Sequence, residues 1–195
     1  MPNLSGRLAS IIVAACLLTG CQPPAPTPSP LPSYRCTPEA GGAEFDCSQK
    51  QYDDMVAKDK LYAEAEAVYR KFFDEDVRIY RAGGVDQPTA VLLETAHGQF
   101  VEDSMDLYRG LKADSRRLQG DVRLVSLVRK PGISKESSVV VFAAYTDARS
   151  ATVLEHGKAV GHGFLIEELI YFGRFDGILK IQGADGQQEG KCAGS

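Results

Sequence analysis

The chain has 195 residues, of which 44% are hydrophobic and 25% are charged, a composition typical of a globular protein rather than of a disordered or fibrous one. Its formal net charge of -4 at pH 7 argues against nucleic acid as a partner, because nucleic-acid-binding domains present a basic face. One folded domain is expected at this length once the N-terminal segments described next are set aside.

The first element is an apolar run at residues 8–18, which follows Arg7 and ends in Leu-Thr-Gly-Cys at positions 18–21. A basic residue, an apolar stretch of about 11 residues and small residues at a cleavage site are the parts of a secretory signal peptide. The run is too short to span a bilayer, which takes about 20 residues, and no later stretch approaches that length. We therefore expect residues 1–20 to be a signal peptide.

The tetrapeptide at positions 18–21 resembles the lipobox of bacterial lipoproteins, whose cysteine takes a diacylglyceryl group before the signal is removed. The resemblance implies two or three acyl chains, palmitate among them, on Cys21. That number gives stable anchoring where a single chain binds a membrane only marginally. We expect a lipid-anchored protein on the extracytoplasmic face of the cell membrane. Cleavage by an ordinary signal peptidase, with Cys21 merely nearby, is the alternative.

A proline-rich segment follows the lipobox, with six prolines in residues 22–32. Proline at alternate positions prevents helix formation and removes the donors that a sheet needs, so this segment is expected to be polyproline-like. At about 3.1 Å per residue it would hold a domain about 35–40 Å from the lipid surface. We expect residues 21–50 to be a disordered tether with a Cys loop, and residues 51–192 to be a single α+β domain.

Five cysteines are present, and Cys16 and Cys21 fall in the signal segment and the lipobox. Export permits a disulfide, and the remaining three thiols allow only one. A Cys36–Cys47 bridge would close a short loop and remove roughly 3 kcal/mol of unfolded-state entropy. The alternative joins Cys192 to Cys36 or Cys47 and pins the C-terminal tail. We prefer Cys36–Cys47, which leaves the role of Cys192 open.

Three helices are predicted next, at residues 52–81, 89–96 and 100–116. The first is long and amphipathic, with apolar residues at spacings of three, four and seven and a broad aromatic stripe. Ser48 or Gln49 opens it, and Gly83-Gly84 ends it. The charge run at residues 74–76 is interpreted as a solvated face, because consecutive helical residues point around the axis rather than together.

Strands are predicted after Gly120, where the apolar pattern changes. Their expected ranges are 121–129, 138–146, 151–155, 163–174 and 178–182. Asp176-Gly177 is a hairpin signal between the last two. The polar segment at residues 185–191 is left unassigned.

Helices followed by antiparallel strands predict an α+β fold in which a curved sheet wraps the long helix. This order, and the ending Tyr-Phe-Gly-Arg-Phe-Asp-Gly-Ile-Leu-Lys-Ile at positions 171–181, resembles the nuclear-transport-factor or ketosteroid-isomerase-like cone over residues 52–182. Together with the lipobox and tether, the chain resembles secreted lipoproteins of high-GC Gram-positive bacteria. The resemblance implies a pocket between the sheet and the helices.

In isomerase and dehydratase members of that fold, the pocket holds a carboxylate or histidine with a tyrosine or a second acid. Glu167 and Glu168 must face opposite sides of one strand, so one of them faces the cone. Glu168 and Tyr171 are the candidates for such chemistry, and the competing expectation is that both glutamates lie on a wet rim. No position aligns with the family's catalytic groups, which argues against catalysis.

Metal and cofactor sites are not predicted. His97, His156 and His162 fall at breaks and turns, and no helix carries two histidines on one face. The motifs of nucleophilic hydrolases and of nucleotide-binding loops are missing as well.

Residues 139–145 and 165–172 are apolar on both faces of their strands, whereas a sheet with one wet face alternates. The second face needs a cover, which a second copy, another envelope protein or the chain's own tail or Cys loop could supply. We therefore expect a non-catalytic, lipid-anchored domain that binds a partner protein or a small apolar ligand. An enzyme of the isomerase or dehydratase type, acting through Glu168 or Tyr171, is the alternative.

Overall fold

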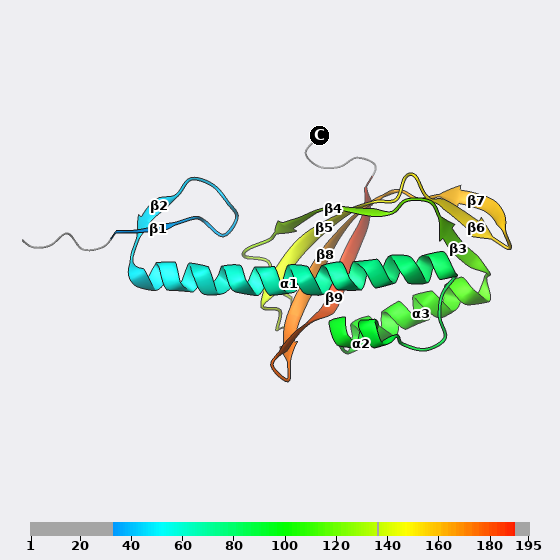
Figure 1. Ribbon diagram of the computed structural model, residues 1–195, viewed down its shortest axis with the longest axis horizontal. Coiled ribbons are helices and arrows are strands. Elements are labelled where there is room, and N and C mark those ends of the chain that lie inside the picture. Colours follow the sequence, from blue (N-terminus) through cyan, green and yellow to red (C-terminus); the bar gives the residue numbers. More distant parts are fainter. Residues whose placement is uncertain (1–32, 136, 190–195) are drawn as a thin grey trace, which may run out of the picture. The chain divides into compact units, whose positions relative to one another are not determined.

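The computed structural model describes residues 33–135 and 137–189, which fall in one compact unit. The expected signal peptide, Cys21, the proline-rich segment and Cys192 lie outside the described residues. The fold class is α+β, as predicted: three helices pack against antiparallel sheets (Figure 1). In the part of the chain that the structure describes, no helix combines the length and apolar character that a membrane crossing requires.

The long helix α1 spans Gln49–Ala82 and is capped at both ends. Ser48 accepts a hydrogen bond from the Gln51 amide, and the Gln51 side chain accepts one from the Ser48 amide. This reciprocal capping box satisfies two amides that would otherwise lack partners. The helix ends at Gly83, whose φ of 83° is the left-handed conformation favoured at helix C-termini. Both predicted ends of the helix are confirmed.

Helices α2 (Ala90–Thr95) and α3 (Gln99–Ala113) lie beside the C-terminal half of α1 (Figure 1). The loop from α1 approaches α3 so closely that a Cβ at Gly84 would lie 2.0 Å from the carbonyl oxygen of Tyr108. Gly84 also has a φ of 91°, which only glycine adopts readily. The glycine therefore lets the two helices meet and fixes Tyr108 against α1, where its side chain is fully buried.

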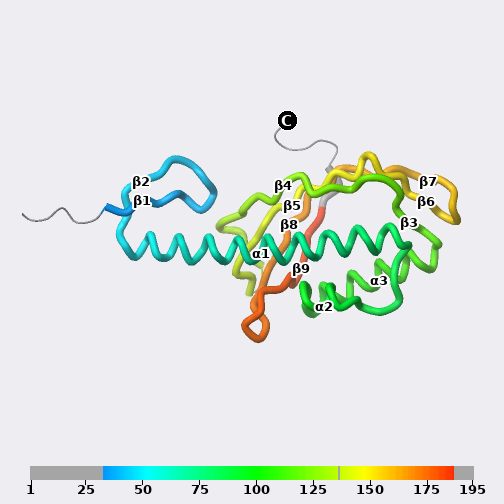
Figure 2. The backbone as a smooth tube through the Cα atoms, viewed as in Figure 1, coloured from blue at the N-terminus to red at the C-terminus, as the bar shows by residue number. Residues whose placement is uncertain are grey.

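The main sheet has the order β4-β5-β8-β9, and α1 lies across one of its faces (Figure 2). Its strands are β4 (Arg123–Arg129), β5 (Val140–Asp147), β8 (Leu165–Phe175) and β9 (Ile178–Glu189), all paired antiparallel. The predicted hairpin between β8 and β9 is confirmed: Asp176 and Gly177 have φ values of 52° and 81°, as the turn that suits a twisted hairpin requires. β9 runs beyond residue 182, where the sequence pattern ended.

A second sheet has the order β3-β6-β7, with strands β3 (Arg116–Gln119), β6 (Thr152–Glu155) and β7 (Lys158–His162). The predicted third helix ended at residue 116, but α3 ends at Ala113, and Ser115 turns the chain with a φ of 51°. β3 and β7 were not predicted, and β7 begins where the sequence indicated only a turn.

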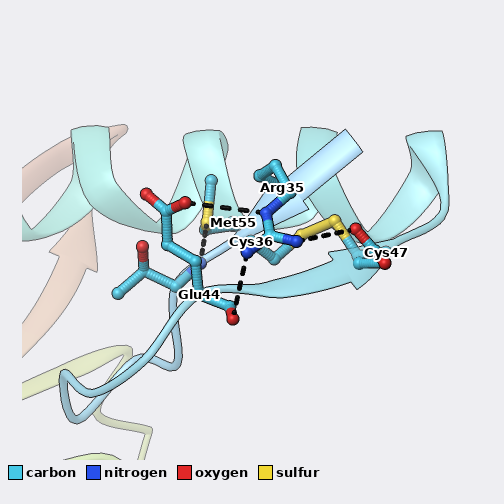
Figure 3. Close-up of polar contacts among 7 residues, drawn as sticks. Arg35, Cys36, Glu44, Cys47 and Met55 are labelled. Carbon is cyan, nitrogen blue, oxygen red and sulfur yellow. Dashed lines mark hydrogen bonds and ion pairs between the residues drawn. A yellow bond between two sulfur atoms is a disulfide. The ribbon is translucent and has the colours of Figure 1, made fainter. Parts of the chain in front are cut away.

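A disulfide-linked hairpin precedes α1. Strands β1 (Tyr34–Cys36) and β2 (Phe45–Cys47) pair antiparallel, and Cys36 is bonded to Cys47, which confirms the preferred pairing. Figure 3 shows Arg35 beside the bond. The Arg35 guanidinium donates a hydrogen bond of 2.9 Å to the Asp46 carboxylate. The Thr37 amide donates to the Met55 sulfur, and Cys36 is buried against α1. The Cys loop therefore packs on the helix.

The core lies between α1 and the inner face of the main sheet. It consists of buried aromatic and aliphatic side chains from the helices and from β5, β8 and β9, among them Tyr62, Tyr69, Phe72, Met105, Phe142, Ile170, Phe172 and Ile181. On the outer face Val141, Ala143 and Tyr171 are also buried, whereas Val128 is 42% exposed. The β4–β5 loop reaches this face, because the Lys135 ammonium lies 5.3 Å from the Tyr171 ring centroid.

Candidate functional site

A cavity of about 250 Å³ lies between α1, the inner face of the main sheet and the β3-β6-β7 sheet. Its walls are mainly apolar and aromatic. The aromatic rings come from α1 and from the residue before β8: Tyr69, Phe72, Phe73, Tyr80 and Phe164. Two carboxyl groups, Asp76 and Glu168, also line it. Enclosed apolar walls with a few polar groups are characteristic of small-molecule sites.

Asp76 projects from α1 into this cavity. The Tyr108 hydroxyl donates a hydrogen bond of 2.6 Å to its Oδ1 atom. Burial, with a smaller contribution from the nearby Glu168 carboxyl, raises the pKa of Asp76 to about 7 against the opposing effect of this hydrogen bond. A carboxyl in this position exchanges its proton near neutral pH.

The prediction of a solvated face for residues 74–76 is wrong for Asp76. Asp74 is exposed, and Glu75 pairs with Arg78 at 2.7 Å. Each helical residue is rotated by about 100° about the helix axis from the one before. Asp76 therefore points to a different side of the helix from Asp74. Asp76 thus enters the aromatic stripe that the same helix presents to the core.

Glu168 reaches the cavity from β8, opposite Ala144 on β5 and Gly186 on β9. A Cβ at Gly186 would lie 3.2 Å from the Glu168 Cγ and 3.3 Å from its Oε1, so the bare glycine makes room for the carboxyl. Burial raises the pKa of Glu168. Glu168 lines the cavity and is half-buried. Glu167 faces the other side of the sheet and accepts a hydrogen bond from the Tyr145 hydroxyl.

Tyr171 does not line the cavity, although it was named with Glu168 as a candidate. Residues 168 and 171 are separated by an odd number of positions along β8, so their side chains point to opposite faces. Tyr171 lies on the outer face beneath Lys135. The tyrosines that accompany Glu168 are instead Tyr69 and Tyr80, whose pKa values are raised chiefly by burial, with contributions from both carboxyl groups.

Asp76, Tyr69, Tyr80 and Tyr108 were not predicted as site residues, yet three of them lie on one helical stripe. Tyr69, Phe72, Phe73, Asp76 and Tyr80 follow the spacing of three and four that marks a single helix face. An acidic residue at a position of this apolar stripe is the sequence signal that could have identified Asp76 as a site residue.

Among the described residues, neither carboxyl group has a cationic partner. In the ranges 33–135 and 137–189, no lysine, arginine or histidine contributes to the pKa of Asp76 or Glu168. Arg117 on β3 lines the cavity, but its side chain is exposed. The same ranges contain no group of three or more histidine, cysteine, aspartate or glutamate side chains that could hold a metal ion.

A larger groove of about 820 Å³ lies between the Cys loop, α1 and β4, and it is wide open. Its charged side chains pair across it: Arg129 with Asp59, and Lys58 with Glu39 at 3.7 Å. The charged side chains of the groove are therefore already paired with one another. The cavity between α1 and the two sheets is the better candidate for a ligand site.

The cavity can enclose one small apolar molecule and present two carboxyl groups to it. Comparison with protein-family models finds no match for this chain, and comparison with curated protein sequences finds no significant match.

Proposed function

We propose that this protein binds a small, largely apolar ligand in the cavity between α1 and the two sheets. The observation that carries the proposal is a partly enclosed aromatic cavity that two carboxyl groups also line. A core formed only for stability would fill this space with side chains, because unfilled volume costs stability and buried carboxyl groups cost more. The burial of Val141, Ala143 and Tyr171 favours a small ligand over a second copy or an envelope protein on the outer face.

We also propose that the domain acts at the cell envelope, anchored through lipid on Cys21. The support is the sequence alone: an apolar run, Leu-Thr-Gly-Cys at positions 18–21 and a proline-rich segment. The confirmed Cys36–Cys47 disulfide agrees with an oxidising compartment. The relationship to the nuclear-transport-factor-like cone also remains a proposal, supported by the order of helices and strands.

A cavity-filling substitution tests ligand binding. Val153→Phe introduces a ring at a position that lines the cavity. Titration calorimetry with p-cresol, a small aromatic with one hydrogen-bond donor, is expected to show binding to the wild-type protein. The variant should bind about tenfold more weakly, equivalent to about 1.4 kcal/mol. Val125→Phe is the matched control, because Val125 is 54% exposed on β4, outside the cavity. Equal affinity in the two variants, or no binding to the wild type, would contradict the proposal.

A second candidate function is proton-transfer catalysis of the isomerase or dehydratase type. The observation in its favour is that Asp76 has a pKa of about 7, the range in which a general acid or base works best. In this version Glu168 and Asp76 exchange protons with the ligand, and Tyr171 takes no part.

Deuterium exchange tests the catalytic candidate. An enolisable ketone such as cyclohexanone, incubated with the protein in D2O at pH 7, should lose its α-protons faster than in buffer. Glu168→Gln is expected to lower the protein-dependent rate about 100-fold, a typical loss for one acid–base group. Glu167→Gln, on the opposite face of the same strand, should leave it unchanged. Proton NMR measures the exchange rate. A rate that does not depend on the protein would exclude this activity for the ketone tested.

A further inference from the structure

We propose that the ligand of this cavity is a small organic cation, an ammonium group carried on an apolar frame. This inference rests on the proposed function, since it names the chemical class that the same cavity takes. It follows from the charge balance of the walls, from the aromatic side chains that line them and from the cavity volume.

The charge balance is the first step. Asp76 and Glu168 line one cavity, and the titratable or charged groups that face them are Tyr69 and Tyr80 on α1, Tyr108 on α3 and Arg117 on β3. The tyrosines are neutral, and the exposed Arg117 shifts the pKa of neither carboxyl. A buried carboxylate without a counter-charge is unfavourable, so it holds a proton or accepts a cation from outside. A ligand ammonium supplies that missing charge.

The aromatic wall is the second step. Tyr69, Phe72, Phe73, Tyr80 and Phe164 line the same space as the two carboxyl groups. An aromatic face carries negative electrostatic potential, and quaternary ammonium groups are recognised by cages of such rings. A neutral apolar ligand would also contact the rings, but it would leave both carboxyl groups without a counter-charge. An anionic ligand would be repelled by them.

The volume is the third step. The cavity of about 250 Å³ lies just below the range of about 300–1,000 Å³ usual for drug-sized ligands. It therefore suits a cation with few non-hydrogen atoms. A metal ion does not fit the donor set, because two carboxyl groups surrounded by aromatic rings leave most of its coordination positions empty.

A matched pair of compounds tests the inference. Choline and 3,3-dimethylbutan-1-ol have the same shape and hydroxyl group, and differ in that a positive nitrogen replaces a neutral carbon. Titration calorimetry of the full-length protein in maltoside micelles at pH 8 should show choline binding at least about tenfold more tightly. Glu168→Gln should reduce this preference several-fold, because Asp76 still supplies one carboxylate, and Glu167→Gln should keep it in full. Both substitutions conserve shape, and circular dichroism shows whether each variant is folded; Asp76→Asn provides a second test of the cavity charge.

The pH dependence gives an independent readout, because the charge of choline does not change with pH. Affinity for choline should rise between pH 6 and pH 8 as Asp76, whose pKa is about 7, loses its proton. Affinity for the neutral alcohol should stay constant over the same range.

Three outcomes would overturn the inference. If the alcohol binds as tightly as choline, the cavity binds apolar ligands without preference for a cation, and the proposed function stands. If neither compound binds but p-cresol does, the cation inference fails and the proposed function again stands. If none of the three binds, both fail.

Discussion

Serine in place of Cys21 is expected to leave the protein without lipid. The diacylglyceryl group of a lipoprotein is transferred to a cysteine sulfur, and a serine hydroxyl at the same position is a far weaker nucleophile than a thiolate. Each buried methylene contributes about 0.8 kcal/mol to membrane binding, so two or three acyl chains hold a protein almost permanently. Labelled palmitate should therefore be incorporated into the wild-type protein and be absent from Cys21→Ser.

The second readout is the mass of the chain. A lipoprotein signal is removed only after the cysteine is modified, so Cys21→Ser should accumulate as the precursor with residues 1–20 attached. Such a precursor can still associate with membranes through its apolar run, and for that reason fractionation alone does not decide the question. Cys16→Ser is the matched control, because it removes a thiol from the same segment and leaves the lipobox intact. Unchanged palmitate labelling in Cys21→Ser would refute the anchor.

The long helix, the β8–β9 hairpin and the fold class were predictable because these features have strong signals in the local sequence. The capping residues and the apolar stripe fix α1 at both ends, and Asp176-Gly177 fixes the register of the β8–β9 hairpin. The α+β class follows from helices preceding strands.

The strands that were missed carry weaker signals within their own residues. β3 reads Arg-Arg-Leu-Gln and is largely exposed, and β7 reads Lys-Ala-Val-Gly-His and is exposed along most of its length. β3 pairs with β6, which lies more than 30 residues away along the chain, so that pairing depends on tertiary contacts that a single sequence does not show. β7 pairs with β6 through a two-residue turn at His156-Gly157, whose φ values are 49° and 80°, but its own residues lack the apolar alternation that predicts a strand.

Of the residues that form the site, Glu168 was predicted from the sequence, and the others were not. Alternation along β8 correctly allowed Glu168 to face the cavity, but the same alternation excludes Tyr171, three positions away. Asp76 was missed because residues 74–76, although expected to point in different directions around the helix axis, were all assigned to solvent, whereas the direction of Asp76 coincides with the aromatic stripe. Tyr108 lies 32 positions from Asp76 along the chain and contacts it through the tertiary packing of α3 on α1, where Gly84 allows a close approach to the Tyr108 carbonyl.

Removing the charge of Asp76 is expected to stabilise the ligand-free protein at neutral and alkaline pH. Burial raises the pKa of Asp76 from 3.8 to about 7, so the unfolded chain loses this proton near pH 4 while the folded protein keeps it until about pH 7. The folded state binds more protons in that window, and its stability therefore falls as pH rises from 4 to 7. The full shift corresponds to about 4 kcal/mol at pH 8. Asp76→Asn has no such proton to lose, and its amide oxygen can still accept the Tyr108 hydrogen bond.

Urea unfolding at two pH values measures the effect. At pH 8 Asp76→Asn should be more stable than the wild type by about 2–4 kcal/mol, and at pH 4, where the wild-type carboxyl is protonated, the difference should be small. Asp74→Asn changes an exposed carboxyl on the same helix and should alter stability by no more than about 0.5 kcal/mol at either pH. A less stable Asp76→Asn at pH 8 would mean that the carboxylate stabilises the fold. A more stable variant means that the chain carries Asp76 at a cost in stability, as binding and catalytic groups commonly do.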